Sequence, residues 1–195
     1  MTERWRADDE HIVETAARLH SGAVVSFPTD TLYAVAARAL DPVAVSRLYR
    51  VKRRPEKQPM IWLVSNAAVV EPFAEISPRA ADLMARFWPG PLTLVLAAKP
   101  IVGEPTLAVR APNHPVALRL LTKLGEPVAS SSANRGGEAP PTDADAVVAG
   151  LGDDLDIVLD GGPCELGQPS TILDLSGEGP RILRQGAIPA SALLP

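Results

Sequence analysis

The stretch AVVSFPTDTLY, residues 23–33, decides the fold. Its first five residues are apolar except for one serine, and Pro28 follows at once, which is typical of a short strand buried on both faces. Hydroxyls, a carboxylate and a phenol follow directly, in residues 28–33. Residues 8–21 precede the strand with apolar side chains on one helical face, and Gly22 supplies a stop. A helix, a buried strand and a polar turn in this order predict an α/β domain with polar groups at strand ends.

The same alternation continues along the sequence. Cap residues, prolines and one-face apolar spacing predict further helices at 41–51, from 77 up to Pro89, from Asn113 or His114 through 124, and at 142–151. Short apolar runs predict strands at 60–64, 92–97, 106–110, 127–130, 156–160, 170–175 and 181–183. Interleaved helices and strands predict an α/β domain with an open mixed sheet.

Composition limits the class of protein. A chain of 195 residues with 46% hydrophobic and 22% charged residues is an ordinary globular chain, so we expect a single domain over residues 1–195. Its net charge of −4 argues against a protein that coats nucleic acid non-specifically. Cys164 is the only cysteine, which excludes an intrachain disulfide and zinc sites built on paired cysteines. No apolar run approaches the ~18 residues of a membrane span, so we expect a cytoplasmic protein with no membrane partner.

Residues 50–57 hold the densest charge signal, with five basic residues in eight positions. Such a run is often a solvated helix end, where cations complement the helix dipole. Pro55 and Pro59 restrict the backbone beside it, which would suit a polyphosphate site with cations held in place. Both interpretations stay open from the residues alone.

Two polar stretches follow predicted strands. Residues 130–137, SSSANRGG, and residues 28–33 offer hydroxyls, an amide and a carboxylate, which suit an anion or a small polar molecule. Each is also compatible with an ordinary polar turn, with Asp30 bonding its own backbone in the second. Arg110 and Arg184 are further cations at apparent strand ends.

Several common site signatures are absent from the sequence. It contains no Walker A loop, no Gly-x-Gly-x-x-Gly, no His-Glu-x-x-His and no Gly-x-Ser-x-Gly. The three histidines lack metal-ligand spacing, so we expect no protein-held metal, and His114 before Pro115 is more typical of a helix cap. Hydroxyls, an amide and arginines remain, which suit alignment of reactive substrates, as in nucleotidyl transfer from ATP with Mg²⁺.

A set of short motifs, taken in order, resembles the YrdC-like family of threonylcarbamoyl-AMP synthases over roughly residues 10–190. The motifs are Pro28-Thr29-Asp30-Thr31-x-Tyr33, Lys52-x-Arg54-Pro55, Trp88-Pro89-Gly90-Pro91-Leu92-Thr93, Val109-Arg110-x-Pro112-x-His114-Pro115, Ser132-Ala133-Asn134, Ser170-Thr171-Ile172 and Leu183-Arg184-x-Gly186. The resemblance implies a twisted mixed sheet around a positively charged cavity. It implies an enzyme, a nucleotidyltransferase, that converts L-threonine, bicarbonate and ATP to threonylcarbamoyl-AMP and pyrophosphate. A separate tRNA threonylcarbamoyl transferase complex would then use the product.

The resemblance also implies roles for individual residues. The threonine part would be held by Thr31, Tyr33, Arg110, Ser130 and Ser170. ATP or the adenylate would be held by Lys52, Arg54, Thr106, Ser132, Asn134 and Arg184. Lys52 and Arg54 would also be catalytic, because they would offset charge on the phosphates. The Trp88-Pro89-Gly90-Pro91 segment is interpreted as a structural turn.

The sequence departs from the family pattern at three places. Asp30 stands where a glutamate is usual, Ala34 where a glycine is usual, and Gly136-Gly137 where Ser-Gly is usual. The end at Pro195 is expected to reflect the short, single-domain bacterial form without the C-terminal domain of longer members. Two alternatives remain: a YrdC-like RNA-binding module, with weak RNA binding as a further property, or a homologue with a different carbamoyl-adenylate substrate.

Overall fold

The computed structural model describes residues 2–53 and 58–194. Its α-helices are α1 Asp9–His20, α2 Pro42–Lys52, α3 Pro78–Phe87, α4 Pro115–Leu124 and α5 Ala144–Leu151. Its strands are β1 Glu3–Arg6, β2 Val25–Phe27, β3 Ala34–Arg38, β4 Ile61–Leu63, β5 Leu92–Ala97, β6 Thr106–Arg110, β7 Val128–Ser132, β8 Ile157–Asp160, β9 Thr171–Asp174 and β10 Arg181–Arg184. Short 3₁₀ helices lie at Ala67–Val69, Pro100–Val102, Gly152–Asp154 and Ala190–Ala192. The predicted α/β class is therefore confirmed.

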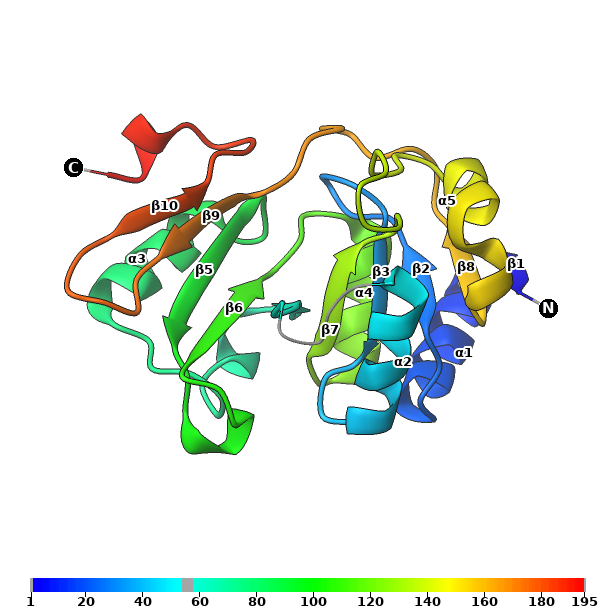
Figure 1. Cartoon of the computed structure of the whole chain (residues 1–195), viewed down its shortest axis with the longest axis horizontal. Coiled ribbons are helices and arrows are strands. Elements are labelled where there is room, and N and C mark those ends of the chain that lie inside the picture. Colours follow the sequence, from blue (N-terminus) through cyan, green and yellow to red (C-terminus); the bar gives the residue numbers. More distant parts are fainter. Residues whose placement is uncertain (1, 54–57, 195) are drawn as a thin grey trace.

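Within these described ranges, the ten strands form one open, twisted sheet in the order β1-β8-β2-β3-β7-β4-β6-β5-β9-β10 (Figure 1). β8 is parallel to both β1 and β2, β4 is parallel to β6, and β5 is parallel to β9. The other neighbouring pairs are antiparallel. The sheet is thus mixed, as predicted, and the segment from β8 to β9 crosses between its two halves.

The α-helices begin where the local signals predicted. Asp41 caps α2 by accepting hydrogen bonds from two backbone N–H groups, and Ser77 caps α3 in the same way with one. His114 caps α4, because its ring nitrogen accepts a hydrogen bond from the N–H of Val116. Burial lowers the pKa of His114, which favours the neutral ring that this cap requires. The cap interpretation of His114 is confirmed.

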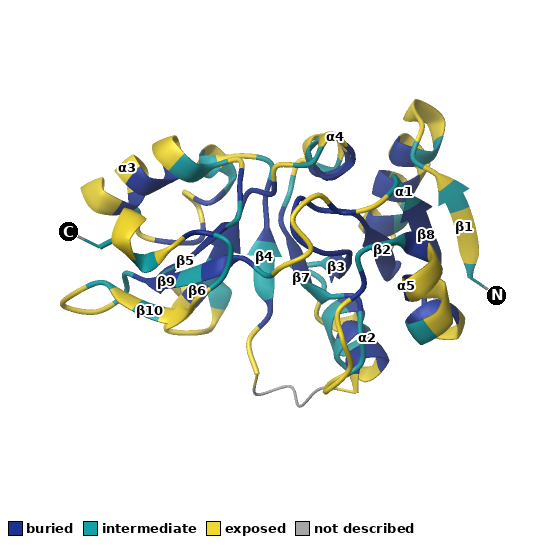
Figure 2. Ribbon diagram, turned by 90° about the horizontal axis from the view of Figure 1, so that it is seen from above, coloured by how far each residue is buried: buried dark blue, intermediate teal, exposed yellow. Residues whose placement is uncertain are grey.

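Helices cover the two halves of the sheet differently. In the half that contains β2, β3 and β8, α1 and α4 pack on one face and α2 and α5 on the other. In the half that contains β5, β6 and β9, α3 packs on one face. Figure 2 shows α1, α3 and α4 along one side of the sheet and α2 and α5 along the other. In the described part of the chain, no α-helix covers the second face of β5, β6 and β9.

Two strands were not predicted, and both have compositions that argue against a strand. β3 reads AVAAR, and alanine has a low strand propensity, but pairing with β2 and β7 imposes the extended form. β1 reads ERWR and forms an edge of the sheet, where charged side chains are usual. Among the described helices, none combines the length and apolar character needed to cross a bilayer.

Candidate active site

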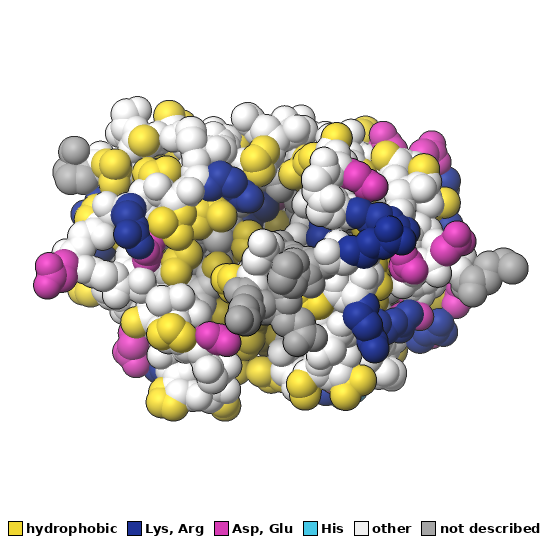
Figure 3. Space-filling view, in the orientation of Figure 1, with side chains coloured by type: hydrophobic (Ala, Val, Ile, Leu, Met, Phe, Trp, Pro, Cys, Tyr) yellow, Lys and Arg dark blue, Asp and Glu magenta, His cyan; other side chains and the backbone are white. Residues whose placement is uncertain are grey.

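A cavity of about 640 Å³ opens on the face of β5, β6 and β9 that carries no α-helix. Its wall continues through the polar loop between β2 and β3 and the end of β7. Figure 3 shows a hollow near the centre of this face, bordered by apolar and basic side chains. Eight of the predicted site residues line it: Thr31, Tyr33, Arg110, Ser130, Ser132, Asn134, Ser170 and Arg184. The fold therefore brings residues from distant parts of the sequence together in the lining of one cavity.

Arg110, the last residue of β6, forms a buried ion pair at the site. Its Nη2 donates to Asp30 Oδ1, and its Nη1 donates to Thr31 Oγ1 at 2.8 Å. Asp30 Oδ1 also accepts a hydrogen bond from the N–H of Asn113 at 3.1 Å. The Asp30 and Arg110 side chains are only 4% and 7% exposed. The alternative in which Asp30 merely bonds its own turn is therefore wrong, because its partners lie about eighty positions away.

Arg110 stays charged beside Asp30 and keeps hydrogen-bond donors for a ligand. Burial lowers the pKa of Arg110, while the charge and hydrogen bond of Asp30 act to raise it. An arginine stays protonated under such shifts. A guanidinium has five N–H donors, and the contacts with Gly90, Thr31 and Asp30 use three of them. One N–H on each terminal nitrogen remains without a partner among the described residues, and this fork matches a carboxylate or phosphate.

The Trp88–Pro91 turn positions Arg110 through a hydrogen bond to the backbone of Gly90. The carbonyl of Gly90 accepts a hydrogen bond from Arg110 Nε at 3.0 Å, and the Gly90 N–H donates to the carbonyl of Ala111 at 2.8 Å. A Cβ at residue 90 would lie 2.3 Å from the carbonyl oxygen of Phe87, so a larger residue does not fit without a backbone shift. The structural interpretation of this turn agrees with these contacts, and the turn acts on the site through Arg110.

Ser170 and Arg184 form the wall on the side of β9 and β10. Arg184 Nη2 donates to the carbonyl and the hydroxyl of Ser170 at 2.9 and 3.0 Å. The Ser170 hydroxyl also shares a 2.8 Å hydrogen bond with Thr93 on β5. Burial lowers the pKa of Arg184, whose charge is close enough to Arg110 to lower the pKa of that residue as well. Two guanidiniums therefore face one cavity, and its described lining contains no carboxylate.

The third wall is the end of β7 and the turn that follows it. Ser130 donates its hydroxyl to the carbonyl of Ile61 at 2.9 Å, so this hydroxyl is partly engaged within the sheet. Ser132 donates its hydroxyl to Asn134 Oδ1. The Asn134 side-chain amide donates to the carbonyls of Arg135 and Glu138 at 2.9 and 2.8 Å. These contacts fold the turn back on itself.

Three predicted site residues stand apart from the lining. Lys52 is 3% exposed, its Nζ donates to the carbonyls of Ser132 and Asn134, and it is not among the described lining residues. Thr106 is exposed and lies at the opposite end of β6 from Arg110, outside the described lining. Arg54 lies outside the described residues. The assignments of these three to ATP stay predictions.

Tyr33 is among the lining residues, whereas its hydroxyl is bonded to the segment after β8. The hydroxyl donates to the carbonyl of Gly162 at 2.8 Å and accepts from the N–H of Gly161 at 3.3 Å. Burial raises the pKa of Tyr33, so the phenol stays protonated. Its polar atom is therefore engaged with the segment after β8, and its assignment to threonine stays a prediction.

Some lining residues were missed by the sequence interpretation. They are Gln58 and several apolar residues, among them Val95, Ala108, Ile172 and Leu183. Thr29 and Ser131 also line the cavity and belong to the two polar stretches that the sequence singled out. Period-2 alternation is the signal for three of the apolar residues, because Val95 and Ala108 fall between core residues of β5 and β6, and Ile172 precedes the core residue Leu173 on β9. Gln58 carries no comparable local signal.

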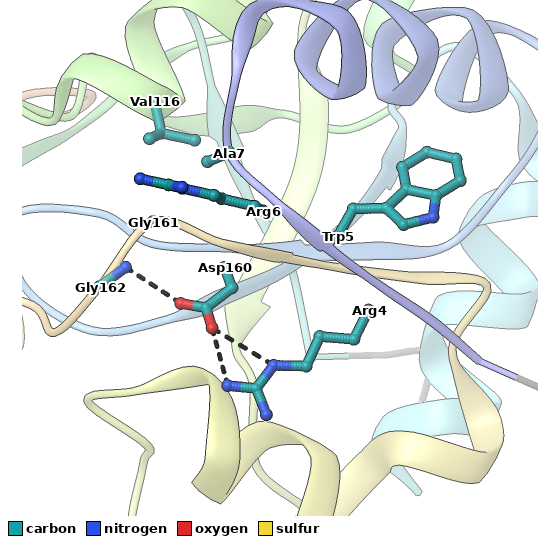
Figure 4. Close-up of a pocket in the computed structure, with 8 residues that line it drawn as sticks. All are labelled: Arg4, Trp5, Arg6, Ala7, Val116, Asp160, Gly161 and Gly162. Carbon is teal, nitrogen blue, oxygen red and sulfur yellow. Dashed lines mark hydrogen bonds and ion pairs between the residues drawn. The ribbon is translucent and has the colours of Figure 1, made fainter.

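A second cavity, also of about 640 Å³, lies between β1, the end of β8 and the first turn of α4 (Figure 4). Arg4 lines it, but its charge is balanced by ion pairs with Asp145 and Asp160 at 2.6 and 2.7 Å. None of the predicted site residues lines this cavity. The first cavity is therefore the candidate active site.

Comparisons with known proteins agree with this geometry. Residues 17–186 match the sequence model of the Sua5/YciO/YrdC domain, whose description reads "Telomere recombination". A threonylcarbamoyl-AMP synthase of Bacillus subtilis (strain 168) is 38% identical over 96% of this chain and 59% of its own length. A putative threonylcarbamoyl-AMP synthase of Mycobacterium tuberculosis (strain ATCC 25618 / H37Rv) is 39% identical over 91% of this chain and 84% of its own length.

A solved structure shows the same fold. The crystal structure of Pyrococcus abyssi Sua5 complexed with L-threonine superposes with a TM-score of 0.92 at 35% identity. The match covers 99% of this chain and 59% of the Pyrococcus chain, so this chain spans well under two thirds of that relative. The family model and the identities over nearly the whole chain confirm the resemblance inferred from the motifs. The chain belongs to the Sua5/YciO/YrdC family.

Proposed function

We propose that this chain is a nucleotidyltransferase that forms threonylcarbamoyl-AMP and pyrophosphate from L-threonine, bicarbonate and ATP. One observation carries the proposal: residues that the family resemblance assigns to threonine and to ATP line a single cavity with two arginines and no carboxylate in its described lining. Relatives named threonylcarbamoyl-AMP synthase, and a family structure that holds L-threonine, support it.

Arg110 would bind the threonine carboxylate. Its two remaining N–H groups form a fork of the kind that pairs with a carboxylate, and Asp30 and Gly90 hold the guanidinium in one orientation. Thr31 shares this network through Arg110 Nη1, so its hydroxyl is placed to select a polar substrate next to the fork. Pre-organised donors of this kind bind a ligand without first losing side-chain freedom.

The nucleotide would occupy the side of β9 and β10. Val95, Ala108 and Leu183 give this side an apolar surface suited to a purine ring, and Arg184 adds a positive charge beside it. The positive potential of the cavity as a whole remains a proposal that rests on Arg110 and Arg184.

The chemistry needs alignment more than a protein nucleophile. The threonine nitrogen attacks the bicarbonate carbon, and a carbamate forms as water leaves. A carbamate oxygen then attacks the α-phosphorus of ATP, the bond to the bridging oxygen breaks, and pyrophosphate leaves with that electron pair. Cationic groups in a low-dielectric cavity would stabilise the charge that develops on the phosphates.

Mg²⁺ would enter with ATP. In the described residues, no group of three or more His, Cys, Asp or Glu side chains could hold a metal ion, and the described cavity lining offers hydroxyl and amide oxygens. These residues do not form a metal site of their own, so phosphates and water would supply most ligands of the ion. Bound there, the ion would neutralise phosphate charge.

The product would serve modification of tRNA, through a separate transferase complex that takes the threonylcarbamoyl group. No observation on the described residues favours the RNA-binding alternative. The direct test is pyrophosphate release from ATP with Mg²⁺ and bicarbonate, measured with L-threonine, with L-serine and without an amino acid. We expect release that depends on threonine, with threonylcarbamoyl-AMP identified by mass spectrometry. Release that ignores the amino acid, or no release from a folded protein that binds ATP, would overturn the proposal.

A further inference from the structure

The polar loop between β2 and β3, residues 28–33, holds two groups that bind the Arg110 guanidinium. Thr29 shapes this loop from within. Its hydroxyl accepts hydrogen bonds from the N–H groups of Thr31 and Leu32, at 3.2 Å each, and donates to the Leu32 carbonyl at 2.7 Å. These contacts bend the loop but do not attach it to its surroundings, so contacts with other segments hold it against Arg110.

Tyr33, the last residue of the 28–33 loop, attaches it to the two glycines that follow β8. The Tyr33 hydroxyl donates to the carbonyl of Gly162 and accepts from the N–H of Gly161, at 2.8 and 3.3 Å. The first residue of the loop touches the same place, because a Cβ on Gly161 would lie 2.8 Å from Pro28 Cγ. Both ends of the loop therefore contact these glycines.

Asp160, the last residue of β8, holds the glycines in turn. Its Oδ1 accepts a hydrogen bond from the Gly162 N–H at 3.1 Å, and its Oδ2 pairs with Arg4 at 2.7 Å (Figure 4). Gly162 has a φ of 85°, which glycine adopts readily, and an aspartate two residues earlier is a common support for such a turn. A chain of hydrogen bonds thus runs from Asp160 through Gly162 to the Tyr33 hydroxyl.

Packing alone does not hold the two glycines in place. Gly161 and Gly162 line the second cavity (Figure 4), and both are only half-buried. Neither carries a side chain that could pack, and glycine has more backbone freedom than any other residue. The hydrogen bonds of Asp160 and Tyr33 therefore determine where this segment lies.

We propose that Tyr33 and Asp160 are positioning residues for the binding of L-threonine. They fix the 28–33 loop through the two glycines, and the loop holds the Arg110 guanidinium in the orientation that presents its remaining N–H donors. Asp160 acts from outside the described lining of the candidate active site. The inference rests on the proposed use of threonine at this cavity, and it gives the Tyr33 hydroxyl a role other than contact with the substrate.

Tyr33→Phe removes the hydroxyl and keeps the ring. We expect KM for L-threonine to rise about tenfold, while kcat at saturating threonine and KM for ATP change by less than about twofold. Thr15→Val is the matched control, since Thr15 is also fully buried and donates its hydroxyl to a backbone carbonyl, that of His11 at 2.6 Å, outside the described lining. An unchanged KM for threonine in Tyr33→Phe, or equal losses for threonine and ATP, would overturn the proposal.

Two aspartates separate positioning from direct contact with the substrate. Asp160 and Asp145 both pair with Arg4, at 2.7 and 2.6 Å, but only Asp160 also accepts from the Gly162 N–H. We expect KM for L-threonine to rise about threefold to tenfold in Asp160→Ala and to stay unchanged in Asp145→Ala. No rise in Asp160→Ala would overturn the proposal. An equal rise in both variants would do the same, because it would trace the effect to Arg4.

A double-mutant cycle tests whether the two residues act through one segment. In kcat/KM for L-threonine, the variant with Tyr33→Phe and Asp160→Ala should lose no more than about threefold beyond the worse single variant. Multiplicative losses in the double variant would overturn the shared positioning role.

The deciding measurement is amide hydrogen exchange of Thr31 and Leu32 without any substrate. We expect exchange in Tyr33→Phe to be about tenfold faster than in the wild type, because the loop loses its attachment, with no change in Asp145→Ala. Unchanged exchange in Tyr33→Phe would overturn the proposal. If Tyr33→Phe does not fold, Asp160→Ala is measured in the same way, with the same two outcomes. Faster exchange without threonine-dependent pyrophosphate release would overturn the proposed function and still support the attachment of the loop.

Discussion

Arg110 and Lys52 are both buried cations beside the same cavity, yet their partners differ in kind. Arg110 lines the cavity, pairs with the carboxylate of Asp30 and keeps two N–H donors without a partner among the described residues. Lys52 is outside the described lining and donates to the backbone carbonyls of Ser132 and Asn134. A planar five-donor fork can be held by protein groups and still present donors to a ligand, whereas an ammonium has three donors in total. The two buried cations therefore differ in the kind of group that holds them: a carboxylate, a hydroxyl and one carbonyl for Arg110, and backbone carbonyls for Lys52.

The comparison predicts its largest effect for Arg110→Lys. Lysine keeps a charge for Asp30 but loses the fork, so two charge-assisted hydrogen bonds of about 1.5–3 kcal/mol each should be lost from the substrate complex. We expect kcat/KM for L-threonine to fall about 100- to 10,000-fold. The measurement is threonine-dependent pyrophosphate release.

The control for this change is Arg181→Lys. Arg181 also pairs with an aspartate, Asp174 at 2.9 Å, but its side chain is 72% exposed on β10. We expect little change in this variant. A change of less than threefold in Arg110→Lys would contradict the role of the fork.

Asp30→Asn should lower stability as well as activity. Asparagine keeps an acceptor for Arg110 and for the Asn113 N–H, but it removes the charge opposite a buried guanidinium. Breaking a buried ion pair costs about 3–5 kcal/mol, and we expect about 3 kcal/mol in the free energy of unfolding, from denaturant titration. Asp145→Asn, at an 83% exposed ion-pair partner of Arg4, should cost about 1 kcal/mol or less. Equal free energies of unfolding for the two variants would show that the buried Asp30–Arg110 ion pair stabilises the protein no more than an exposed pair does.

Local signals were sufficient for the helix starts and for the strand-end arginines. Asp41-Pro42 and Ser77-Pro78 each carry a cap and a first-turn proline within two residues, and α2 and α3 begin there. Arg110 follows a run of strand formers, and it is the last residue of β6. Such signals act over a few residues, so they can be detected without knowledge of the tertiary structure.

Side-chain contacts between residues that are distant in sequence could not be predicted from local signals. Asp30 meets Arg110, and Lys52 meets the carbonyl of Ser132, each across eighty positions of sequence. The family motif placed Lys52 at the site, but backbone carbonyls have no sequence signature, so its engagement with the turn appears only in the structure. β3 was missed for the same reason, because pairing on both edges overrides the low strand propensity of its alanines.

Thr31→Val tests an uncharged partner of Arg110, the Thr31 hydroxyl. Valine keeps the shape of threonine but removes the acceptor for Arg110 Nη1 and the 2.9 Å hydrogen bond with Thr29. Loss of one partner of a buried hydrogen bond costs about 1–3 kcal/mol, so we expect KM for L-threonine to rise about tenfold, with a smaller change for ATP. Thr31→Ser retains the hydroxyl and should stay closer to the wild type. Equal KM values for threonine in the valine variant and the wild type would remove Thr31 from the site.

The smallest effect is expected at an ion pair that is partly exposed and outside the described cavity lining, Arg47 with Asp156. Arg47 binds both oxygens of Asp156 at 2.6 and 2.9 Å, and the Val24 N–H donates to the same carboxylate at 2.7 Å. Burial alone would raise the pKa of Asp156, but these contacts together lower it from its ordinary value of 3.8. A lowered pKa in the folded state stabilises the protein above pH 3.8, and this stabilisation is lost as the pH falls through the folded-state pKa.

Asp156→Asn should therefore be less stable than the wild type at pH 6 by about 1 kcal/mol, because a partly exposed pair is screened by solvent. The difference should shrink as the pH falls below about 4, where the wild-type carboxylate also becomes neutral. Threonine-dependent activity at pH 7 should not change, since Asp156 lies outside the described cavity lining. A stability difference that persists unchanged at pH 2.5 would mean that the shape of the side chain, rather than its charge, stabilises this end of β8. A fall in activity like that of Asp30→Asn would show that ion pairs remote from the cavity also set the geometry of Arg110.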